Sequence, residues 1–427
     1  MLIEVVKPGD SLWAIAKRYG VTADEVARIN GIDDPTRLVA GQALVIPTKD
    51  RVHVVAPGES LWTIAGKYGT SVDQLMRANQ ITDPSRLYIG QRLRVPGEPV
   101  RPVIETNGYL QPSNAEKDRG IVAETANYLT YFSIFQYIVQ KDGTLQAPND
   151  EAALAAIRPT PSVPMMVITN FEGGTFTPDT ARAIFDNAEA RQNLIDNVIA
   201  TMKRKSFYAL NIDFEHMYPA DREKYNAFLR EITTRVHAEG KLVSTALAPK
   251  TSAEQAGQWY EAHDYPAHGE IVDFVIIMTY EWGWSGGPPM AVAPIPQVRS
   301  VLEYALSVIP AGKIMMGAPL YGYNWTLPYV KGGKFAPTLS PKAAVELARD
   351  VGAYIQYDYT AQAPHFSYYD NDAKEHIVWF EDARSMQAKF DLIKEYGLRG
   401  ISYWVLGQSF PQNWALLEAN FTIKSLK

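Results

Sequence analysis

The chain has 427 residues, more than the roughly 100–200 residues of most single domains, so at least two domains are predicted. Hydrophobic residues make up 46% of the chain and charged residues 21%, which is an ordinary globular composition and excludes a mainly disordered protein. The formal net charge of −6 argues against a nucleic-acid-binding surface. No apolar run approaches the roughly 18 residues of a membrane span, so neither nucleic acid nor a membrane is expected as a partner.

Cysteine is absent, which excludes disulfides, thiolate nucleophiles and cysteine-bound metals and leaves the cellular compartment open. The first residues contain no apolar stretch of signal-peptide length, and we expect no export signal of the usual kind. Aromatic residues reach 11% of the chain. That share fits a large hydrophobic core and a carbohydrate-binding cleft equally well.

The N-terminal part of the chain consists of two copies of one sequence pattern. The segment Pro8–Trp13 returns as Pro57–Trp62, with five of its six residues unchanged and an offset of 49 residues. The same offset holds without gaps as far as Pro47 and Pro96. Similarity over this length indicates a tandem repeat.

Each copy is predicted to fold as strand, helix, helix, strand. In the first copy Asp10 or Ser11 is placed to cap the first helix, and residues 41–47 form the closing strand. A unit of this size has a thin core, and we expect Trp13 and Trp62 to help fill it.

Both copies resemble the LysM module, a small domain that binds N-acetylglucosamine-containing glycans such as peptidoglycan and chitin. In that family the glycan lies in a shallow groove between the loop before the first helix and the loop after the second. The resemblance implies glycan contacts from Gly9, Asp10, Ser11, Leu12, Ile32, Asp34, Gly58, Glu59, Ser60, Leu61, Ile81 and Asp83. Taken alone, the same residues are also typical of turns and helix caps.

Beyond a short linker at Pro96–Pro99, apolar strand-like runs alternate with amphipathic helices. Eight such runs predict a closed barrel of parallel strands, the TIM (β/α)8 fold of the α/β class. The expected strands are Val103–Tyr109, Tyr128–Phe135, Met165–Asn170, Tyr208–Glu215, Leu242–Ala248, Val272–Tyr280, Ile314–Leu320 and Gly400–Val405.

The stretch from about residue 324 to residue 397 is too long for one helix and predicts a small α+β insertion. Its expected strands are Tyr354–Tyr359, His365–Tyr369 and His376–Phe380. The chain is thus divided into residues 1–48, 50–97 and 101–427, which are the two modules and the barrel.

Two carboxylates lie together at the end of the fourth expected barrel strand. The strand period of two places Asn211, Asp213 and Glu215 on one face, with the two acids about 6.6 Å apart along the strand. Active sites of such barrels form at the carboxyl ends of the strands. Crowding of like charges beside apolar neighbours raises the proton affinity of one carboxyl, as glycoside hydrolysis requires. A structural acid pair bound to arginine or lysine is the alternative interpretation of these residues.

Three segments in chain order resemble motifs of glycoside hydrolase family 18, the chitinase and endo-N-acetylglucosaminidase barrel. Asp213–Glu215 is similar to the end of that family's aspartate-rich signature, Met278–Glu281 to its sixth-strand motif, and Ser402–Trp404 to its eighth-strand tryptophan. In that family an acid protonates the glycosidic oxygen while the acetamido oxygen of the substrate itself attacks the anomeric carbon, with net retention.

The resemblance implies a role for each matching residue. Glu215 is the general acid and then the base, Asp213 orients and stabilises the acetamido group, and Tyr280 hydrogen-bonds that group. Trp404 is the floor beneath the reacting sugar. Further substrate contacts are implied for Asn211, Met278, Glu281 and Trp282. No cofactor and no metal are expected.

Two departures from the family pattern concern the tuning of this site. The earlier aspartates of the signature align with Tyr208 and Asn211, and the usual aspartate after the sixth-strand tyrosine is Glu281. Because Asn211 cannot share a proton with Asp213 as a carboxyl would, the protonation of Asp213 and the shape of the acetyl pocket are open.

A second group of polar residues, His263, Asp264, His268 and Glu270, lies in a segment predicted as a loop over residues 260–269. The spacing matches no metal-binding pattern, and no metal site is predicted.

The sequence also predicts positions for three ring-bearing residues near the expected site. His216 follows the acid, and strand alternation predicts that it turns away from the catalytic face into a packing position. Trp282 and Trp284 follow the sixth strand in a Gly-rich loop and are expected to form the wall of a sugar subsite.

The combination of two LysM-like copies, a family-18-like barrel and no signal peptide resembles the spore cortex-lytic N-acetylglucosaminidases of spore-forming bacteria. It implies a peptidoglycan hydrolase that cleaves after N-acetylglucosamine and lies at the spore coat or cortex. A chitinase or chitooligosaccharide hydrolase shares the same residues. A non-catalytic wall-binding lectin is the alternative of another class, against which the presence of both Asp213 and Glu215 argues. The oligomeric state is not predicted.

Overall fold

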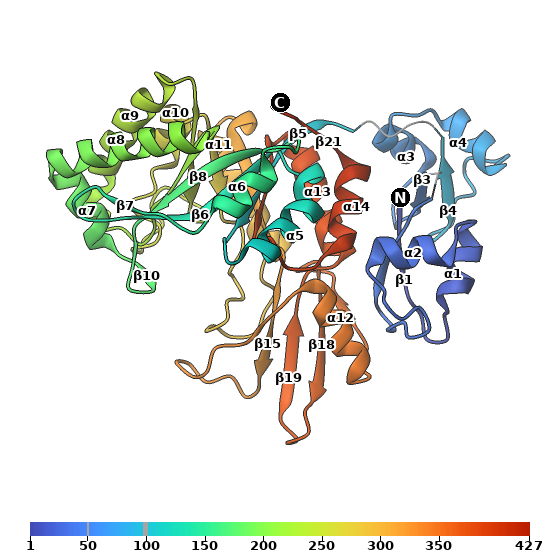
Figure 1. Cartoon of the computed structure of the whole chain (residues 1–427). Coiled ribbons are helices and arrows are strands. Elements are labelled where there is room, and N and C mark those ends of the chain that lie inside the picture. The colour runs from blue at the N-terminus through green and yellow to red at the C-terminus, as the bar shows by residue number, and fades with distance from the viewer. Residues whose placement is uncertain (49–50, 97–100) are drawn as a thin grey trace.

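The computed structural model describes residues 1–48, 51–96 and 101–427. A closed parallel barrel forms the larger part of the molecule, the two repeats lie beside it, and an antiparallel insertion extends from it, at the bottom of Figure 1. The predicted architecture of two small modules and a TIM barrel with an α+β insertion is confirmed. Residues 97–99 of the expected linker lie outside the described residues. No helix in the described part of the chain is long and apolar enough to cross a membrane.

Each repeat is an antiparallel pair of strands packed on two short helices. The elements are β1 (Leu2–Val5), α1 (Leu12–Tyr19), α2 (Ala23–Asn30) and β2 (Ala43–Ile46) in the first repeat, and β3 (Arg51–Val54), α3 (Leu61–Tyr68), α4 (Val72–Asn79) and β4 (Arg92–Val95) in the second. Ser11, rather than Asp10, caps α1 by accepting a hydrogen bond from the N–H of Ala14. Ser60 caps α3 in the same way.

The tryptophans of the repeats do not fill the module cores, so that prediction was wrong. Trp13 is 65% exposed and Trp62 is 78% exposed. The buried face of α1 consists of Leu12, Ile15 and Ala16, which have the i, i+3, i+4 spacing of one helix face. The position after the first leucine therefore lies on the outer face in both repeats.

The barrel consists of eight parallel strands, each overlapping a predicted one. They are β5 (Val103–Leu110), β6 (Tyr131–Val139), β8 (Val163–Thr169), β11 (Ala209–Asp213), β12 (Leu242–Leu247), β13 (Phe274–Ile277), β14 (Ile314–Pro319) and β20 (Gly400–Trp404). β5 pairs with both β6 and β20, which closes the barrel. Short strands β7 (Leu145–Gln146) and β21 (Thr422–Ile423) extend the sheet beside β6 and β5.

Helices surround the barrel and bury their apolar faces against it. They are α5 (Ala115–Thr125), α6 (Glu151–Ile157), α7 (Pro178–Asp186), α8 (Ala188–Lys205), α9 (Arg222–His237), α10 (Tyr265–Ile271), α11 (Ile295–Val308), α13 (Ala383–Tyr396) and α14 (Pro411–Asn420). The short helix α10 corrects the prediction of a loop over residues 260–269. Asp264 caps it by accepting a hydrogen bond from the N–H of Ala267.

The insertion lies between β14 and α13 and has its own small core. Its elements are β15 (Gly322–Thr326), β16 (Thr338–Leu339), α12 (Pro341–Asp350), β17 (Gln356–Asp358), β18 (Ala363–Tyr369) and β19 (Glu375–Trp379). The strand order is β16, β15, β19, β18, β17, with antiparallel neighbours. The three predicted strands are present, and β15 and β16 were not predicted. Helix α13 falls within the range expected for the insertion, but its buried side belongs to the main hydrophobic cluster.

Candidate active site

A hollow of about 290 Å³ opens at the rim where the barrel strands end. It is lined by Tyr109, Gln111, Phe135, Gln136, Phe171, Phe176, Asp213, Glu215, Ala246, Trp259, Met278, Tyr280, Glu281 and Trp404. A second hollow of about 350 Å³ shares Trp259, Tyr280 and Glu281 and adds Trp282. The rim therefore offers a largely aromatic cleft with a few acidic groups, which is the composition of a carbohydrate site.

The two predicted acids lie in this hollow. Asp213 is the last residue of β11, and Glu215 follows two residues later, so both point to the inside of the barrel rim. Asp213 is 5% exposed and Glu215 is 8% exposed. Between them Phe214 points the other way and stacks on Tyr225 and Phe228 of α9. The alternation of a strand, which predicted this division, holds for two residues beyond the end of β11.

Burial makes the two carboxyls hold a proton more tightly than free acids do. It raises the pKa of Asp213 to about 7. Burial and then the charge of Asp213 raise the pKa of Glu215 well above its ordinary value. The two groups interact and titrate as a pair. At neutral pH the pair therefore carries a proton, which is the condition for a general acid.

Trp259 contacts the predicted acid directly and was not foreseen. Its indole Nε1 donates a hydrogen bond to Oε2 of Glu215 over 2.6 Å. The indole N–H can only donate, and the carbonyl oxygen of a neutral carboxyl accepts better than its hydroxyl oxygen, so this bond favours the proton of neutral Glu215 on Oε1. The same bond stabilises the ionised form and lowers the pKa of Glu215 against the effect of burial. Trp259 lies in a loop without a regular pattern, so spacing gave no signal for it.

His216 supports that tryptophan. Its ring stacks on Trp259 with centroids 5.8 Å apart, and Gln258 donates a hydrogen bond to its carbonyl. His216 lines neither hollow and packs on Trp259, in agreement with the predicted packing position. Strand alternation is not the cause, because β11 ends at Asp213 and His216 adopts a left-handed conformation with φ of 53°. It is exposed beside the site.

The backbone around the acid is held from both neighbouring strands. Asn170, at the end of β8, accepts a hydrogen bond from the N–H of Glu215 and donates one to its carbonyl, over 2.9 and 2.8 Å. His263 accepts from the N–H of Ala248 and donates from Nε2 to the carbonyl of Phe214. Burial lowers the pKa of His263 to about 4, so the ring is neutral. Asn170 was predicted only as the end of a strand.

The polar group around His263 is thus engaged in the fold. Asp264 accepts hydrogen bonds from Arg222 and Asn226 of α9, and His268 contacts Thr245 of β12. Within residues 1–48, 51–96 and 101–427 no group of three or more His, Asp or Glu side chains is arranged to hold a metal ion.

Asn211 lies beneath the hollow and does not line it. It is fully buried, accepts a hydrogen bond from the hydroxyl of Tyr109 over 3.1 Å and donates one to Ser244. Tyr109 lines the hollow. Asn211 therefore affects the cleft only indirectly, by holding the hydroxyl of Tyr109. Asp213 Oδ1 is buried without a hydrogen-bond partner among the described residues, which leaves an acceptor for a bound group.

Tyr280, Met278 and Glu281 meet at the same rim, as the resemblance of Met278–Glu281 to the sixth-strand motif implied. Glu281 has a left-handed φ of 69° and accepts hydrogen bonds from the hydroxyls of Tyr321 and Tyr323. Burial raises the pKa of Glu281, and these two bonds oppose the rise. The two tyrosines lie where β14 ends and β15 begins, and they were not singled out in the sequence.

The three tryptophans expected in the cleft have different positions. Trp404 packs edge-on against Tyr109 and Phe135, with centroids 5.5 and 4.9 Å apart, and its remaining surface lines the hollow. Trp282 lines the second hollow. Trp284 lines neither, because it packs against Phe335 with centroids 5.9 Å apart and is otherwise 45% exposed. The expectation of a subsite wall was wrong for Trp284.

In the repeats, most of the residues expected to bind glycan lie in two loops, and the structure limits what they offer. Leu12 and Leu61 are buried in the module cores, so only their backbone groups are available. The acidic members accept hydrogen bonds within their own loops: Asp10 from Lys7, Glu59 from Ala56, Asp34 from Thr36 and Asp83 from Ser85. Contact of these residues with a glycan stays a prediction.

The chain belongs to glycosyl hydrolases family 18, whose family model matches residues 108–409, and it carries LysM domains at residues 5–47 and 53–96. It is therefore a glycoside hydrolase with glycan-binding modules. It is 54% identical over 426 residues to the cortical fragment-lytic enzyme of Bacillus subtilis strain 168, with 99% of each chain covered. The enzyme of the same name from Bacillus anthracis is 50% identical, with 99% of this chain and 98% of that one covered.

A solved structure agrees over the full length. The crystal structure of the spore cortex-lytic enzyme SleL of Bacillus cereus matches with a TM-score of 0.92 at 44% identity, covering 100% of this chain and 99% of that one.

Proposed function

We propose that the protein hydrolyses the glycosidic bond after N-acetylglucosamine in spore cortex peptidoglycan and its fragments, and that it acts at the spore coat or cortex. Full-length similarity to enzymes named for cortical fragments supports the substrate. The observation that carries the activity is the buried pair Asp213 and Glu215, which holds a proton at neutral pH inside an aromatic cleft.

In the first step Glu215 donates the proton on Oε1 to the glycosidic oxygen, and the bond from that oxygen to the anomeric carbon breaks. The acetamido oxygen of the same sugar forms the new bond to the anomeric carbon, giving a cyclic oxazolinium ion. Asp213 faces the positive charge that develops on the acetamido nitrogen, and its unpartnered Oδ1 is available to it. The hydroxyl of Tyr280 hydrogen-bonds the same group.

In the second step the leaving group has departed and Glu215 is ionised. It takes a proton from water, whose oxygen bonds to the anomeric carbon as the acetamido oxygen leaves. The two inversions give net retention, and Glu215 returns to its protonated form. Because the nucleophile belongs to the substrate, one acid and one stabilising carboxylate suffice.

The rest of the cleft supports binding of the sugar ring. Trp404 is held by Tyr109 and Phe135 and presents a flat apolar face to the hollow, as C–H groups of a sugar require. Met278, Glu281 and Trp282 complete the surroundings of the acetyl and neighbouring positions. Asn211 contributes by holding the hydroxyl of Tyr109.

Product analysis tests the proposal and separates it from the alternatives. Purified cortex fragments, incubated with the protein and reduced, are expected to show new N-acetylglucosamine ends by mass spectrometry. New muramic ends would instead identify a muramidase. Faster cleavage of chitin oligosaccharides than of cortex fragments would identify a chitinase, and no cleavage of either would leave a wall-binding lectin.

A further inference from the structure

The two LysM repeats have different surroundings although their sequences align without gaps. In the first repeat Val39 is 5% exposed and packs in the core of the insertion. In the second repeat the aligned Tyr88 is 69% exposed, and its neighbour Ile89 is 71% exposed. The same loop is thus covered in one copy and open in the other.

The cover of the first loop comes from the catalytic domain. The N–H of Ile355, just before β17, donates a hydrogen bond to the carbonyl of Ala40 over 3.0 Å. A side chain at Gly41 would place its Cβ 1.9 Å from the carbonyl oxygen of Ile355. A Cβ at the aligned Gly90 would meet nothing within 4 Å. The glycine of the first repeat is therefore required by close approach as well as by its left-handed φ of 86°.

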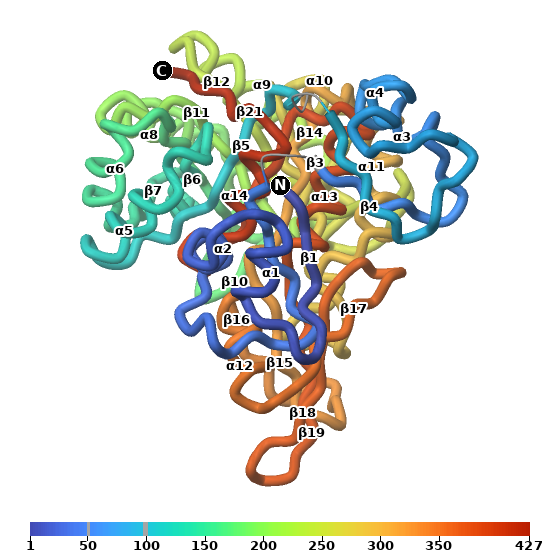
Figure 2. Tube along the Cα trace, turned by 90° about the vertical axis from the view of Figure 1, so that its right-hand side faces the viewer, coloured from blue at the N-terminus to red at the C-terminus, as the bar shows by residue number. Residues whose placement is uncertain are grey.

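The closing strands differ in the same way. All four residues of β2 are buried, whereas β4 alternates between exposed and buried residues. Ala43 and Val45 of β2 belong to the main hydrophobic cluster of the barrel. The second repeat has Arg92 and Arg94 at these two positions. Small apolar side chains let β2 approach the barrel helices, and Figures 1 and 2 show the first repeat against α13 and α14.

Polar contacts fix the end of helix α2. The amide of Gln412, on α14, donates hydrogen bonds to Asn30 Oδ1 and to the carbonyl of Ala43, each over 2.8 Å. A Cβ at Gly31 would lie 2.8 Å from Pro411 Cγ. The second repeat has Gln80 at that position in the same left-handed conformation, with φ of 54°.

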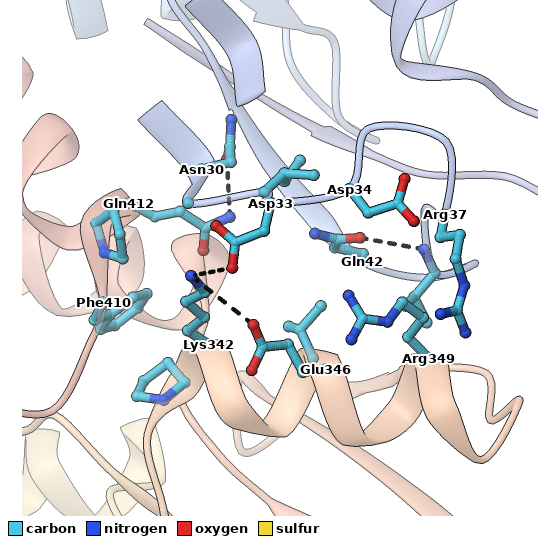
Figure 3. A pocket seen from close by; sticks show the side chains of 16 residues that line it. Asn30, Asp33, Asp34, Arg37, Gln42, Lys342, Glu346, Arg349, Phe410 and Gln412 are labelled. Atoms are coloured by element: carbon cyan, nitrogen blue, oxygen red, sulfur yellow. Dashed lines mark hydrogen bonds and ion pairs between the residues drawn. The ribbon is translucent and has the colours of Figure 1, made fainter. Parts of the chain in front are cut away.

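The next residues of the first repeat face helix α12 across a narrow crevice of about 40 Å³ (Figure 3). Asp33 pairs with Lys342 over 2.7 Å. This loop is the one expected to form one wall of the glycan groove. In the described part of the chain no hydrogen bond or ion pair joins residues 80–90 of the second repeat to residues 101–427.

We propose that the two LysM domains have different tasks. The first is docked on the catalytic domain as a fixed part of it, and the second supplies the affinity of the chain for insoluble glycan. Asp33 and the aligned Thr82 are both exposed, but Asp33 is paired with Lys342 of α12, so a cross-linked glycan network that enters the first groove must pass α12 and displace this pair. The loop around Thr82 has no such bond to residues 101–427 among the described residues. The assignment of the binding task rests on the proposed function.

The docking is tested by exchanging residues between the repeats. The triple variant Gly31→Gln, Ala43→Arg and Val45→Arg gives the first repeat the residues with which the second repeat folds. We expect a larger radius of gyration in small-angle X-ray scattering and a lower melting temperature, while hydrolysis of soluble fragments shows that the barrel is folded. The variant Tyr88→Val with Ile89→Ala places the residues of the first repeat in the exposed loop of the second; it is the control and should scatter as the parent does. A triple variant with the parent's scattering profile would overturn the docking.

The binding task is tested by co-sedimentation with insoluble peptidoglycan in the Glu215→Gln background, in which the glycan is not digested. Thr82→Trp obstructs the second groove and should reduce the bound fraction about tenfold or more. Asp73→Trp, at an exposed position of the same repeat, is the matched control. The triple variant should bind within about twofold of the parent. Loss of binding in the triple variant, or unchanged binding with Thr82→Trp, would overturn the division of tasks.

The two proposals fail in different ways. If the chain releases no N-acetylglucosamine ends and the Glu215→Gln chain does not sediment with peptidoglycan, the proposed function is wrong and the binding task falls with it. If the parent chain hydrolyses and sediments normally, but sedimentation is lost in the triple variant and kept in Thr82→Trp, only the division of tasks is wrong.

Discussion

Three neighbours, Asp213, Trp259 and Asn170, act on different parts of Glu215. Burial beside Asp213 raises its pKa, the N–H of Trp259 on Oε2 opposes that rise, and Asn170 holds its backbone on both sides. Because Trp259 can only donate, its bond to Oε2 favours the acidic proton on Oε1. The oxygen that offers the proton is thus favoured before a substrate binds.

Replacement of the acid gives the most direct test. Glu215→Gln keeps the shape of the side chain and removes the dissociable proton, so kcat should fall by on the order of 10²–10⁴-fold. Sedimentation with peptidoglycan should be unchanged, because the LysM domains are untouched. Near-normal turnover of cortex fragments by this variant would rule out Glu215 as the acid.

Trp259 should tune the pH dependence of the reaction. Trp259→Phe keeps a ring over His216 but removes the hydrogen bond that favours ionised Glu215, so the pKa of Glu215 rises. The alkaline limb of kcat/KM, which reports loss of the protonated acid, should move to higher pH by on the order of one unit. Trp282→Phe alters a cleft tryptophan that does not contact Glu215 and should leave the limb in place. Identical pH profiles for all three proteins would show that the indole N–H has no such role.

At the scale of elements, the end of β11 is held by groups from β8 and from the segment before α10. His263 links the carbonyl of Phe214 to the N–H of Ala248, which follows β12. Both bonds need a neutral ring with its proton on Nε2. The backbone that carries the two acids is therefore tied to the neighbouring strand by a group that titrates.

This tie predicts a pH dependence of stability. The pKa of His263 is lowered from 6.5 to about 4 in the folded chain, so the unfolded chain binds more protons between these values. The stability that depends on neutral His263 is present above pH 6.5 and is lost as pH falls towards 4. His263→Asn, which offers one donor and one acceptor without titrating, should show a melting temperature that falls less steeply across this range. Parallel curves for parent and variant would contradict the prediction.

At the scale of the whole molecule, the catalytic domain and the first LysM repeat share one hydrophobic cluster. Ala43 and Val45 of the first repeat belong to the hydrophobic cluster of the barrel, and Val39 belongs to the core of the insertion. The family-18 unit thus continues into a segment that the sequence pattern assigns to a separate module. We expect the first repeat and the barrel to unfold together.

A matched pair of glycine variants measures this coupling. Gly41→Ala and Gly90→Ala both force a left-handed residue to carry a Cβ, which costs roughly 1–2 kcal/mol in each repeat. Only Gly41→Ala also brings the Cβ against the backbone of Ile355. Calorimetry should therefore show a larger loss of stability of the main transition for Gly41→Ala. Equal losses would mean that the contact with Ile355 contributes nothing.

The sequence alone determined the elements whose patterns are local. The eight barrel strands follow from apolar runs, the repeats from the constant offset, and the pairing of Asp213 with Glu215 from the strand period of two. The local pattern gave a wrong prediction where the buried face of a short helix had to be chosen, as at Trp13. The different surroundings of the two repeats are also visible in the sequence, because Ala43 and Val45 align with Arg92 and Arg94. This difference in side chains does not say what covers the first repeat.

Only the tertiary structure decided which residues touch the acid and what the first repeat packs against. Trp259 and Asn170 lie more than forty positions from Glu215 along the chain and meet it because the barrel brings the ends of its strands to one rim. Gly41 meets Ile355, more than three hundred residues away, because the first repeat packs against the insertion. Such contacts depend on the closure of the barrel and the packing of its helices, which no periodicity within a single segment encodes.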